Sequence, residues 1–278
     1  STRDMGSLTT LYTDKAIDYL NNRRDPTKPF MLYVAHTMMH TIIDASKRFR
    51  GKSEGDLYGD VVEEFDYETG RLLDTVDELG LRDNTLVIYT SDNGPWNQDK
   101  YTKKKKGHPT GSIFWGDAGP LRNGKGSPYE GGYRLPCIAR WPGKIPAGRT
   151  SDAIFSTIDF MPTFASLAGY TVPSDRHIDG INQTELLLGT HESGRDHFYF
   201  QGAGIRLGKW KYLKPDAFFH GYAVEDDRKK VDELYDLEND IGERINLASK
   251  YPKKVTELKE LMLSVEQSDR LRPEDNRR

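Results

Sequence analysis

Residues 85–94 read TLVIYTSDNG, an apolar run that ends in small polar residues. The first six residues are β-branched, aromatic or aliphatic, which predicts a strand. Because α/β sheets open their binding crevice at the carboxyl ends of the strands, residues 91–94 stand where a functional loop is expected. This stretch predicts both an α/β sheet and the place of its functional site.

The segments around this strand favour the same fold class. Residues 29–36 (PFMLYVAH) and 135–141 (LPCIARW) are short apolar runs that predict further strands. Between residues 56 and 79, apolar side chains recur every three or four positions, which predicts a long amphipathic helix that Gly80 ends. A shorter helix is expected over 158–167. Alternating strands and helices favour an α/β fold with a mixed, largely parallel sheet flanked by helices.

The pattern changes near residue 190. Short strand candidates follow, and an amphipathic helix is expected over about residues 252–265. The strand candidates are residues 198–200, 209–213 and 234–237. We therefore predict two domains, an α/β domain of residues 1–190 and a smaller antiparallel sheet-plus-helix subdomain of residues 191–278.

Composition limits the classes of partner. The 278 residues include 40 basic and 43 acidic side chains, a formal charge of −3, which argues against a general grip on nucleic acid or an anionic membrane. No apolar run approaches the roughly 20 residues of a membrane helix, so we expect no membrane span. The first residues, STRDMGSLTT, do not have the pattern of a signal peptide. The residues themselves leave the localisation undetermined.

The loop after the 85–90 strand carries two hard oxygen donors. Asp92 offers a carboxylate and Asn93 an amide oxygen, both suited to Ca²⁺ or Mg²⁺, and Gly94 lets the backbone turn away at once. The sequence Asp-Asn-Gly is also common in ordinary turns. The residues alone leave a metal site and a simple turn as alternatives.

A second glycine-rich segment, residues 121–132 (LRNGKGSPYEGG), places Lys125 between two glycines. Little would shield its ammonium group, a compact charge with three donors, from a bound anion. One interpretation is a clamp for sulfate or phosphate oxygens, and the other is an exposed lysine in a flexible loop. Upstream, Lys100, the lysine run 103–106 and His108 are similarly open to two readings, contact with a sulfated glycan or a solvated loop.

His36 and His40 lie four residues apart in the sequence HTMMHT. We do not expect a zinc motif, because the glutamate of the HExxH pattern is absent and the preceding residues predict a strand. One functional histidine is favoured, His40 at the strand exit, with His36 in packing or in support. Cys137 is the only cysteine, and its place in an apolar run predicts a buried, unmodified packing residue.

Four segments in order resemble the arylsulfatase-like sulfatase family of the alkaline phosphatase superfamily. They are PFMLYVAHTMMH (29–40), TLVIYTSDNGP (85–95), GPLRNGKGSPYEGGYRLPCIARWPG (119–143), and the terminal pair LGKWKYLK (207–214) and ELYDLENDIGERINLA (233–248). The third is the most distinctive, and together they span nearly the whole chain. Met38 and Met39 depart from the family's usual Thr-Ala-Pro-His wording.

The resemblance implies roles for four residues. Asp92 and Asn93 match the family's calcium ligands, Lys125 matches the lysine that contacts the sulfate, and His40 matches the histidine that faces the sulfate ester. Calcium would neutralise sulfate oxygens, while Lys125 and His40 would stabilise or protonate the leaving-group oxygen. Which of these two side chains is the acid stays open.

The family's nucleophile has no counterpart in this sequence. Sulfatases use a formylglycine made from the Cys or Ser of a C/S-x-P/A-x-R motif, and Cys137 does not fit because residue 141 is Trp rather than Arg. We therefore interpret the chain as the C-terminal portion of a sulfatase. Residues 1–190 would be the C-terminal part of its α/β catalytic domain, with the formylglycine on a missing N-terminal part.

The leading hypothesis is the C-terminal part of a calcium-dependent enzyme that hydrolyses sulfate esters, such as those of sulfated carbohydrates. Its other partner would be the N-terminal portion of the same enzyme, without which we expect no activity. The alternatives are a superfamily phosphodiesterase or phosphonate hydrolase, and a noncatalytic binding or assembly chain. The family resemblance implies a periplasmic, secreted or lysosomal location.

Overall fold

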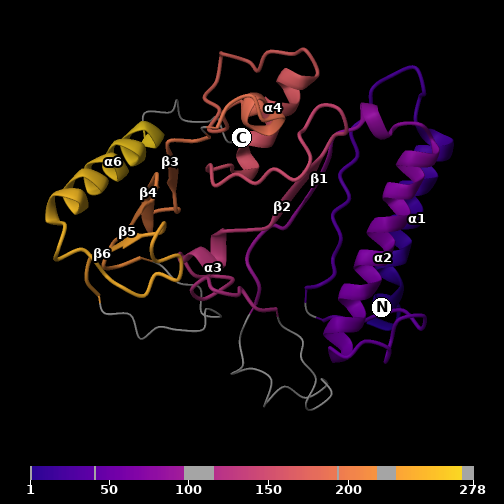
Figure 1. Ribbon diagram of the computed structural model, residues 1–278, viewed down its shortest axis with the longest axis horizontal. Coiled ribbons are helices and arrows are strands. Elements are labelled where there is room, and N and C mark those ends of the chain that lie inside the picture. Colours follow the sequence, from indigo (N-terminus) through magenta and orange to yellow (C-terminus); the bar gives the residue numbers. More distant parts are fainter. Residues whose placement is uncertain (1, 41, 97–115, 193, 218–229, 271–278) are drawn as a thin grey trace, which may run out of the picture. The chain divides into compact units, whose positions relative to one another are not determined.

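The computed structural model of the chain describes residues 2–40, 42–96, 116–192, 194–217 and 230–270. These residues form two compact units: the first holds the described residues up to Val87 together with Gly116, and the second holds the rest from Ile88 onward. Figure 1 follows the chain through its elements. The predicted domain boundary near residue 190 stays a prediction.

The first unit is built on two helices, α1 (Leu8–Asp18) and α2 (Asp56–Glu78), which pack along each other (Figure 1). Short helical turns accompany them: η1 (Thr2–Ser7), the π-helical η2 (Tyr19–Arg23) and η3 (Arg82–Asn84). Helix α2 confirms the long helix predicted from periodicity. Gly80 follows it with a φ of +68°, a left-handed conformation that favours glycine, and its N–H donates to the carbonyl of Asp77.

Helix α2 buries carboxylates as well as apolar side chains. The hydroxyl of Thr10, on α1, donates to Glu64 and Glu68, while Glu64 also accepts the backbone N–H of Ser46. Asp60 accepts three backbone N–H groups from residues 51–53. Burial opposes ionisation of Asp60, but these bonds outweigh it and lower its pKa. The acidic face of α2 thus holds the preceding loop in place.

Residues 29–36 form no helix, and no strand with any described residue. Their exposure alternates as on a strand: Met31 and Tyr33 are 74% and 83% exposed, whereas Leu32 and Val34 are half-buried. The predicted buried strand is therefore wrong for the described part of this chain. The residue types favour a strand, but a strand also requires the hydrogen bonds of a partner.

The second unit begins with a two-stranded sheet of β1 (Val87–Thr90) and β2 (Cys137–Arg140). Both strands match predicted ones. Cys137 is exposed, so the prediction of a buried packing residue is wrong, and Ile138 beside it is also exposed. Sequence indicated the apolar strand correctly, but burial needs a covering layer that no described element provides on these side chains.

Four helical segments belong to the second unit, the first between β1 and β2 and the other three between β2 and β3. They are α3 (Glu130–Tyr133), the 3₁₀ turn η5 (Thr157–Asp159), α4 (Phe160–Leu167) and α5 (Thr184–Leu188). The predicted helix over 158–167 is confirmed by η5 and α4. A capping box at Ser156 and Asp159 begins η5. The buried Asp159 also accepts a hydrogen bond from the guanidinium of Arg195.

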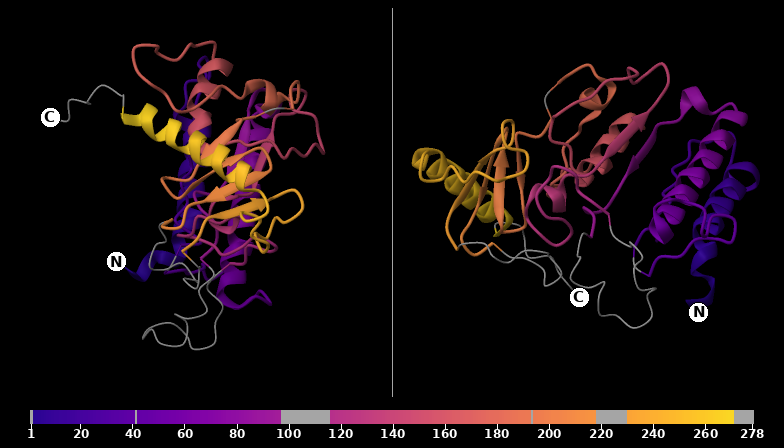
Figure 2. Two further views of the ribbon diagram at one scale, coloured as in Figure 1. Left: turned by 90° about the vertical axis from the view of Figure 1, so that its left-hand side faces the viewer. Right: turned by 60° about the horizontal axis from the view of Figure 1, so that its bottom comes forward.

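The chain ends in a four-stranded antiparallel sheet covered by a helix (Figure 2). The strands are β3 (His197–Tyr199), β4 (Gly204–Leu207), β5 (Trp210–Leu213) and β6 (Glu233–Asp236), in sequential order, and the helix is α6 (Pro252–Arg270). This confirms the predicted antiparallel sheet and terminal helix. None of the helices in the described ranges combines the length and apolar character needed to cross a bilayer.

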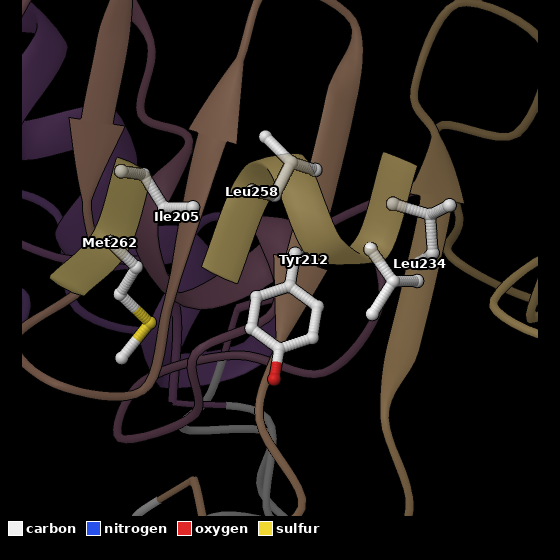
Figure 3. Packing of buried hydrophobic residues seen from close by; sticks show 6 residues of the cluster. Ile205, Tyr212, Leu234, Leu258 and Met262 are labelled. Carbon is white, nitrogen blue, oxygen red and sulfur yellow. The ribbon is translucent and has the colours of Figure 1, made fainter. Parts of the chain in front are cut away.

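Both faces of this sheet are buried. On one face Ile205, Tyr212 and Leu234, which pair in register across three strands, pack against Leu258 and Met262 of α6 (Figure 3). The opposite face carries the register row Arg206, Lys211 and Tyr235, and its apolar residues pack around Tyr129. One sheet therefore binds the terminal helix on one side and the glycine-rich segment 121–132 on the other.

Candidate active site

Asp92 and Asn93 lie in the exposed turn after β1. The backbone N–H of Asn93 donates to the Asp92 carboxylate at 2.9 Å, and the Asn93 amide nitrogen donates to the carbonyl of Gly94 at 3.0 Å. With its nitrogen engaged, the side-chain oxygen of Asn93 is the atom that a cation would bind. Both side chains thus follow the strand as predicted, and each presents an oxygen atom that can bind a cation.

Lys125 lies half-buried in a tight loop before α3, residues 121–129, which is the Lys125 loop or lysine loop. Asn123 and Gly126 on either side adopt left-handed φ values of +60° and +87°. The Asn123 side chain accepts the N–H of Gly124, and the hydroxyl of Ser127 donates to the carbonyl of Gly124. Within the described residues no carboxylate lies at ion-pair distance from the Lys125 ammonium group. These contacts define a structured loop and argue against the flexible-loop interpretation.

Backbone hydrogen bonds join the turn of Asp92 and Asn93 to the segment that contains Lys125. The N–H of Lys125 donates to the carbonyl of Pro95 at 2.8 Å, and the N–H of Gly94 donates to that of Gly132 at 3.0 Å. A Cβ added to Gly94 would lie only 1.8 Å from the carbonyl oxygen of Gly131. The structure thus brings the segments of Asp92, Asn93 and Lys125 together, and this contact requires glycine.

His40 belongs to the first unit. It is exposed at the end of a turn in which its N–H donates to the carbonyl of Thr37 at 3.0 Å. Met38 in the same turn is buried against Ile43, Ala45 and Val61, so one of the two methionines that depart from the family wording packs into the core of this unit. The turn is held by packing and presents His40 at its end.

His36 has the packing role expected of it. Its ring meets Phe65 edge-on at a centroid distance of 4.8 Å and Tyr12 at 5.7 Å. Burial lowers the pKa of His36 against the opposing influence of Glu68, so the neutral ring is favoured. A paired zinc site with His40 has no support from these contacts.

The described residues contain no cluster of three or more His, Cys, Asp or Glu side chains arranged to hold a metal ion. Asp92 and Asn93 are hard oxygen ligands of the type that Ca²⁺ prefers, but calcium takes six to eight such ligands. The donor chemistry fits calcium, with further ligands required from outside these residues. Lys100, the run 103–106 and His108 lie outside the described residues.

Sequence reasoning missed the charged residues beneath the lysine loop. Lys211 and Glu243 are fully buried and lie near Glu130, the residue that begins α3. The sequence contained one signal. In KWKYL, Lys211 lies two residues before Leu213, so in a strand its side chain points to the same face as that core residue. The partners of Lys211 are too distant in sequence to be found by spacing.

Comparison with protein families places the chain. Residues 2–170 match the sulfatase family, and residues 124–268 match the family described as N-sulphoglucosamine sulphohydrolase, C-terminal. The chain belongs to the sulfatase family, of the alkaline phosphatase superfamily, as the four sequence segments indicated. Its homologues are sulfuric ester hydrolases.

Two curated relatives illustrate the range of the family. An N-acetylgalactosamine-6-O-sulfatase of Bacteroides thetaiotaomicron is 34% identical over 266 residues, covering 92% of this chain and 50% of the relative. The steryl-sulfatase of Mus musculus is 40% identical over 221 residues, covering 80% of this chain and 33% of the relative. The chain thus spans half or less of the length of these relatives.

A solved structure confirms the fold class. A Bacteroides thetaiotaomicron sulfatase, from work on the metabolism of multiple glycosaminoglycans, superposes with a TM-score of 0.80 at 33% identity. The match covers 94% of this chain and 55% of that chain. The α/β fold expected from the strand and helix pattern, and its alkaline phosphatase-like form implied by the family resemblance, are therefore confirmed.

Proposed function

We propose that this chain is the C-terminal part of a calcium-dependent sulfatase that hydrolyses sulfate esters. The observation that carries the proposal is the fastening of the Lys125 loop to the turn of Asp92 and Asn93. A cationic side chain and two hard oxygen donors are thereby held on adjoining segments. That combination suits an anionic ester whose oxygens are neutralised by a metal and an ammonium group.

Asp92 and Asn93 would supply two of the calcium ligands. Calcium, when bound, would withdraw charge from the sulfate oxygens. Lys125 would hold a sulfate oxygen, and His40 would face the leaving-group oxygen. Either Lys125 or His40 would deliver the proton to that oxygen as the ester bond breaks. The nucleophile, a formylglycine, would come from the N-terminal portion of the enzyme.

Exposed apolar residues support the N-terminal portion as a partner. Met31 and Tyr33 are exposed on the segment 29–36, which pairs with no described residue as a strand, and Ile138 is 63% exposed on β2. Strand-like segments with exposed apolar side chains are ordinarily paired with a neighbouring strand or covered by another element of the complete protein. We infer that the remainder of the enzyme covers these residues and supplies the other metal ligands.

Substrate class is proposed from the relatives. Those named above act, by their names, on a sulfated amino sugar and on a steryl sulfate, and we favour a sulfated carbohydrate, given the 92% coverage of this chain by the amino-sugar relative. The complete enzyme should be assayed with para-nitrophenyl sulfate and with a 6-sulfated N-acetylgalactosamine, each with calcium and after chelation. Hydrolysis that depends on calcium is the expected result, and this chain alone should be inactive.

The same assay separates the alternatives. A phosphodiester or a phosphonate ester turned over faster than every sulfate ester would identify a hydrolase of the second class instead. Absence of turnover of any ester by the folded, metal-loaded complete protein would leave only a noncatalytic role. The control is the complete enzyme with Lys144→Ala, an exposed lysine of the second unit, which should keep its activity.

A further inference from the structure

A fully buried lysine lies beneath the Lys125 loop. Lys211, in the middle of β5, places its ammonium nitrogen 2.9 Å from Oε1 of Glu130 and 2.8 Å from Oε1 of Glu243. Its charge also stands 4.4 Å from the ring centroid of Phe200. Burying an ammonium group is costly unless it is paired, so these two carboxylates are what allow Lys211 to occupy the site.

The two carboxylates connect Lys211 to the end of the Lys125 loop. Glu130 begins α3, directly after the loop, and its backbone N–H donates to Oε2 of Glu243 at 2.6 Å. Glu243 therefore contacts both the backbone and, through Lys211, the side chain of Glu130. Arg206, the neighbour of Lys211 on β4, adds a weaker ion pair to Glu130 at 3.6 Å. Residue 130 is fixed at both its main chain and its side chain.

The other residues of the loop are anchored on the same face of the sheet. The Tyr129 hydroxyl donates to Glu233 of β6 at 2.9 Å. Arg122 donates to the hydroxyl of Tyr235 at 3.0 Å and to the carbonyl of Glu243 at 2.9 Å, and its guanidinium lies 3.8 Å from the Tyr129 ring centroid. Both ends of the loop are therefore bound to β5, β6 and the segment after β6.

The ionisation of the pair is consistent with this arrangement. Burial opposes ionisation of Glu130, but Lys211 and the neighbouring arginines outweigh it and lower the pKa of Glu130. Burial raises the pKa of Glu243 to about 7, with Lys211 acting against the rise and Glu130 adding to it. The ammonium group of Lys211 therefore favours the ionised form of Glu130, the residue that adjoins the loop.

We propose that Lys211, acting through Glu130 and Glu243, is a positioning residue that sets the location of Lys125 for catalysis. A buried ion pair adds little stability compared with well-packed apolar residues, but it fixes charged groups in one geometry. Misplacement of a catalytic group by about 1 Å can cost on the order of 100-fold in rate. The inference rests on the role of Lys125 in the proposed sulfatase reaction.

The test is a double-mutant cycle in the complete enzyme with para-nitrophenyl sulfate. Lys211→Met keeps an unbranched side chain only one heavy atom shorter and removes the charge, and we expect kcat/KM to fall by about 10- to 100-fold. The same substitution placed in a Lys125→Ala enzyme should lower kcat/KM by less than about 2-fold, because no clamp remains to be misplaced. The control is Lys209→Met, which removes exposed ion pairs to Asp236 and Glu238 on the same sheet.

A second variant guards against misfolding. Glu243→Gln keeps the shape of the side chain and its acceptor for the Glu130 N–H, and the cycle is read from it if Lys211→Met does not fold by circular dichroism and thermal unfolding. Equal losses in the wild-type and Lys125→Ala backgrounds, or a folded variant with full activity, would overturn the positioning role. If the single variant Lys125→Ala keeps full activity, the proposed role of Lys125 is wrong. That result comes from the single variant alone and is thus distinct from a failure of the positioning role of Lys211.

Discussion

The backbone N–H of Lys125 donates to the carbonyl of Pro95 over 2.8 Å, which fixes the glycine-flanked lysine to the turn after β1. Residue 95 closely follows Asp92 and Asn93, so a shift of either loop would move the other. The lysine and the oxygen donors are therefore parts of one local structure, although more than 30 residues separate them in the sequence. This coupling sets the expectations for variants of the site.

Replacing Lys125 or His40 by Ala in the complete enzyme should lower kcat by about 100-fold or more, because each would remove an interaction that strengthens as charge develops on the leaving oxygen. Folding should be unaffected, since both lie in loops. Steady-state kinetics with an aryl sulfate and thermal unfolding provide the measurement, with Lys144→Ala as the control. Near-wild-type turnover of Lys125→Ala, beside an inactive Asp92→Ala enzyme, would mean that the lysine loop is structural.

Asp92→Ala and Asn93→Ala should each weaken calcium binding by the complete enzyme, by about 10-fold or more, since each removes one hard oxygen ligand. Titration calorimetry with calcium and the apo enzyme measures this directly, without reference to turnover. Asp152→Ala, which removes an exposed carboxylate of the same unit, is the matched control. Unchanged calcium affinity in both site variants would exclude these residues as ligands.

Gly94→Ala should disrupt the contact between the two loops. The added Cβ would stand 1.8 Å from the Gly131 carbonyl oxygen, so the loops must separate at a cost of about 1–3 kcal/mol. Gly70→Ala, in the interior of α2 where nothing lies within 4 Å of the added Cβ, should instead stabilise by up to about 1 kcal/mol. Chemical denaturation distinguishes the two, and equal effects would argue against the close contact.

The buried Glu243 predicts a specific pH dependence of stability. Its pKa is raised to about 7 from an ordinary value near 4.5, so the folded chain binds more protons than the unfolded chain between those values. The free energy of unfolding contributed by this group therefore falls as pH rises from about 4.5 to about 7, by up to about 3 kcal/mol. The difference in unfolding free energy between wild type and Glu243→Gln should fall across this window.

Glu260→Gln, an exposed change on α6, is the control for that experiment and should keep the wild-type profile. A pH-independent difference between wild type and Glu243→Gln would show that Glu243 titrates alike in the folded and unfolded chain.

The apolar face beneath α6 should respond strongly to truncation. Leu258 is fully buried among Ile205, Tyr212 and Leu234, so Leu258→Ala should cost about 2–5 kcal/mol through lost burial and the cavity left behind (Figure 3). Leu263→Ala, on the exposed side of the same helix, should change stability by less than about 0.5 kcal/mol. Urea unfolding of the complete enzyme measures both, and similar losses would contradict the assigned packing.

Periodic segments of the fold could be predicted from sequence. Helix α2 and the apolar face of α6 follow three- and four-residue spacing, and β5 and β6 follow runs of strand-forming residues. Helix α1 lacks a regular apolar spacing, and its threonines are weak helix formers. Packing against α2 stabilises this helix. Strand β4 is only four residues long and begins with glycine, so its hydrogen-bonded neighbours define it.

Burial and long-range pairing could not be predicted in the same way. Cys137 and the segment 29–36 have the composition of buried strands, yet local composition does not say whether a covering layer is present. Asp92, Asn93 and Lys125 could be identified because glycines and strand ends mark them locally. Lys211 and Glu243 carry no such local mark, since their role depends on a sheet and a loop meeting.

The segment 29–36 also bears on how this polypeptide can be prepared. It forms no helix, no described residue pairs with it as a strand, and Met31 and Tyr33 are exposed. Such a run is a template for strand pairing between molecules, and it contains no charged side chain to oppose that pairing. We therefore expect polypeptide of this extent to associate through residues 29–36, and co-production with the proposed N-terminal portion should raise the yield of monomeric material.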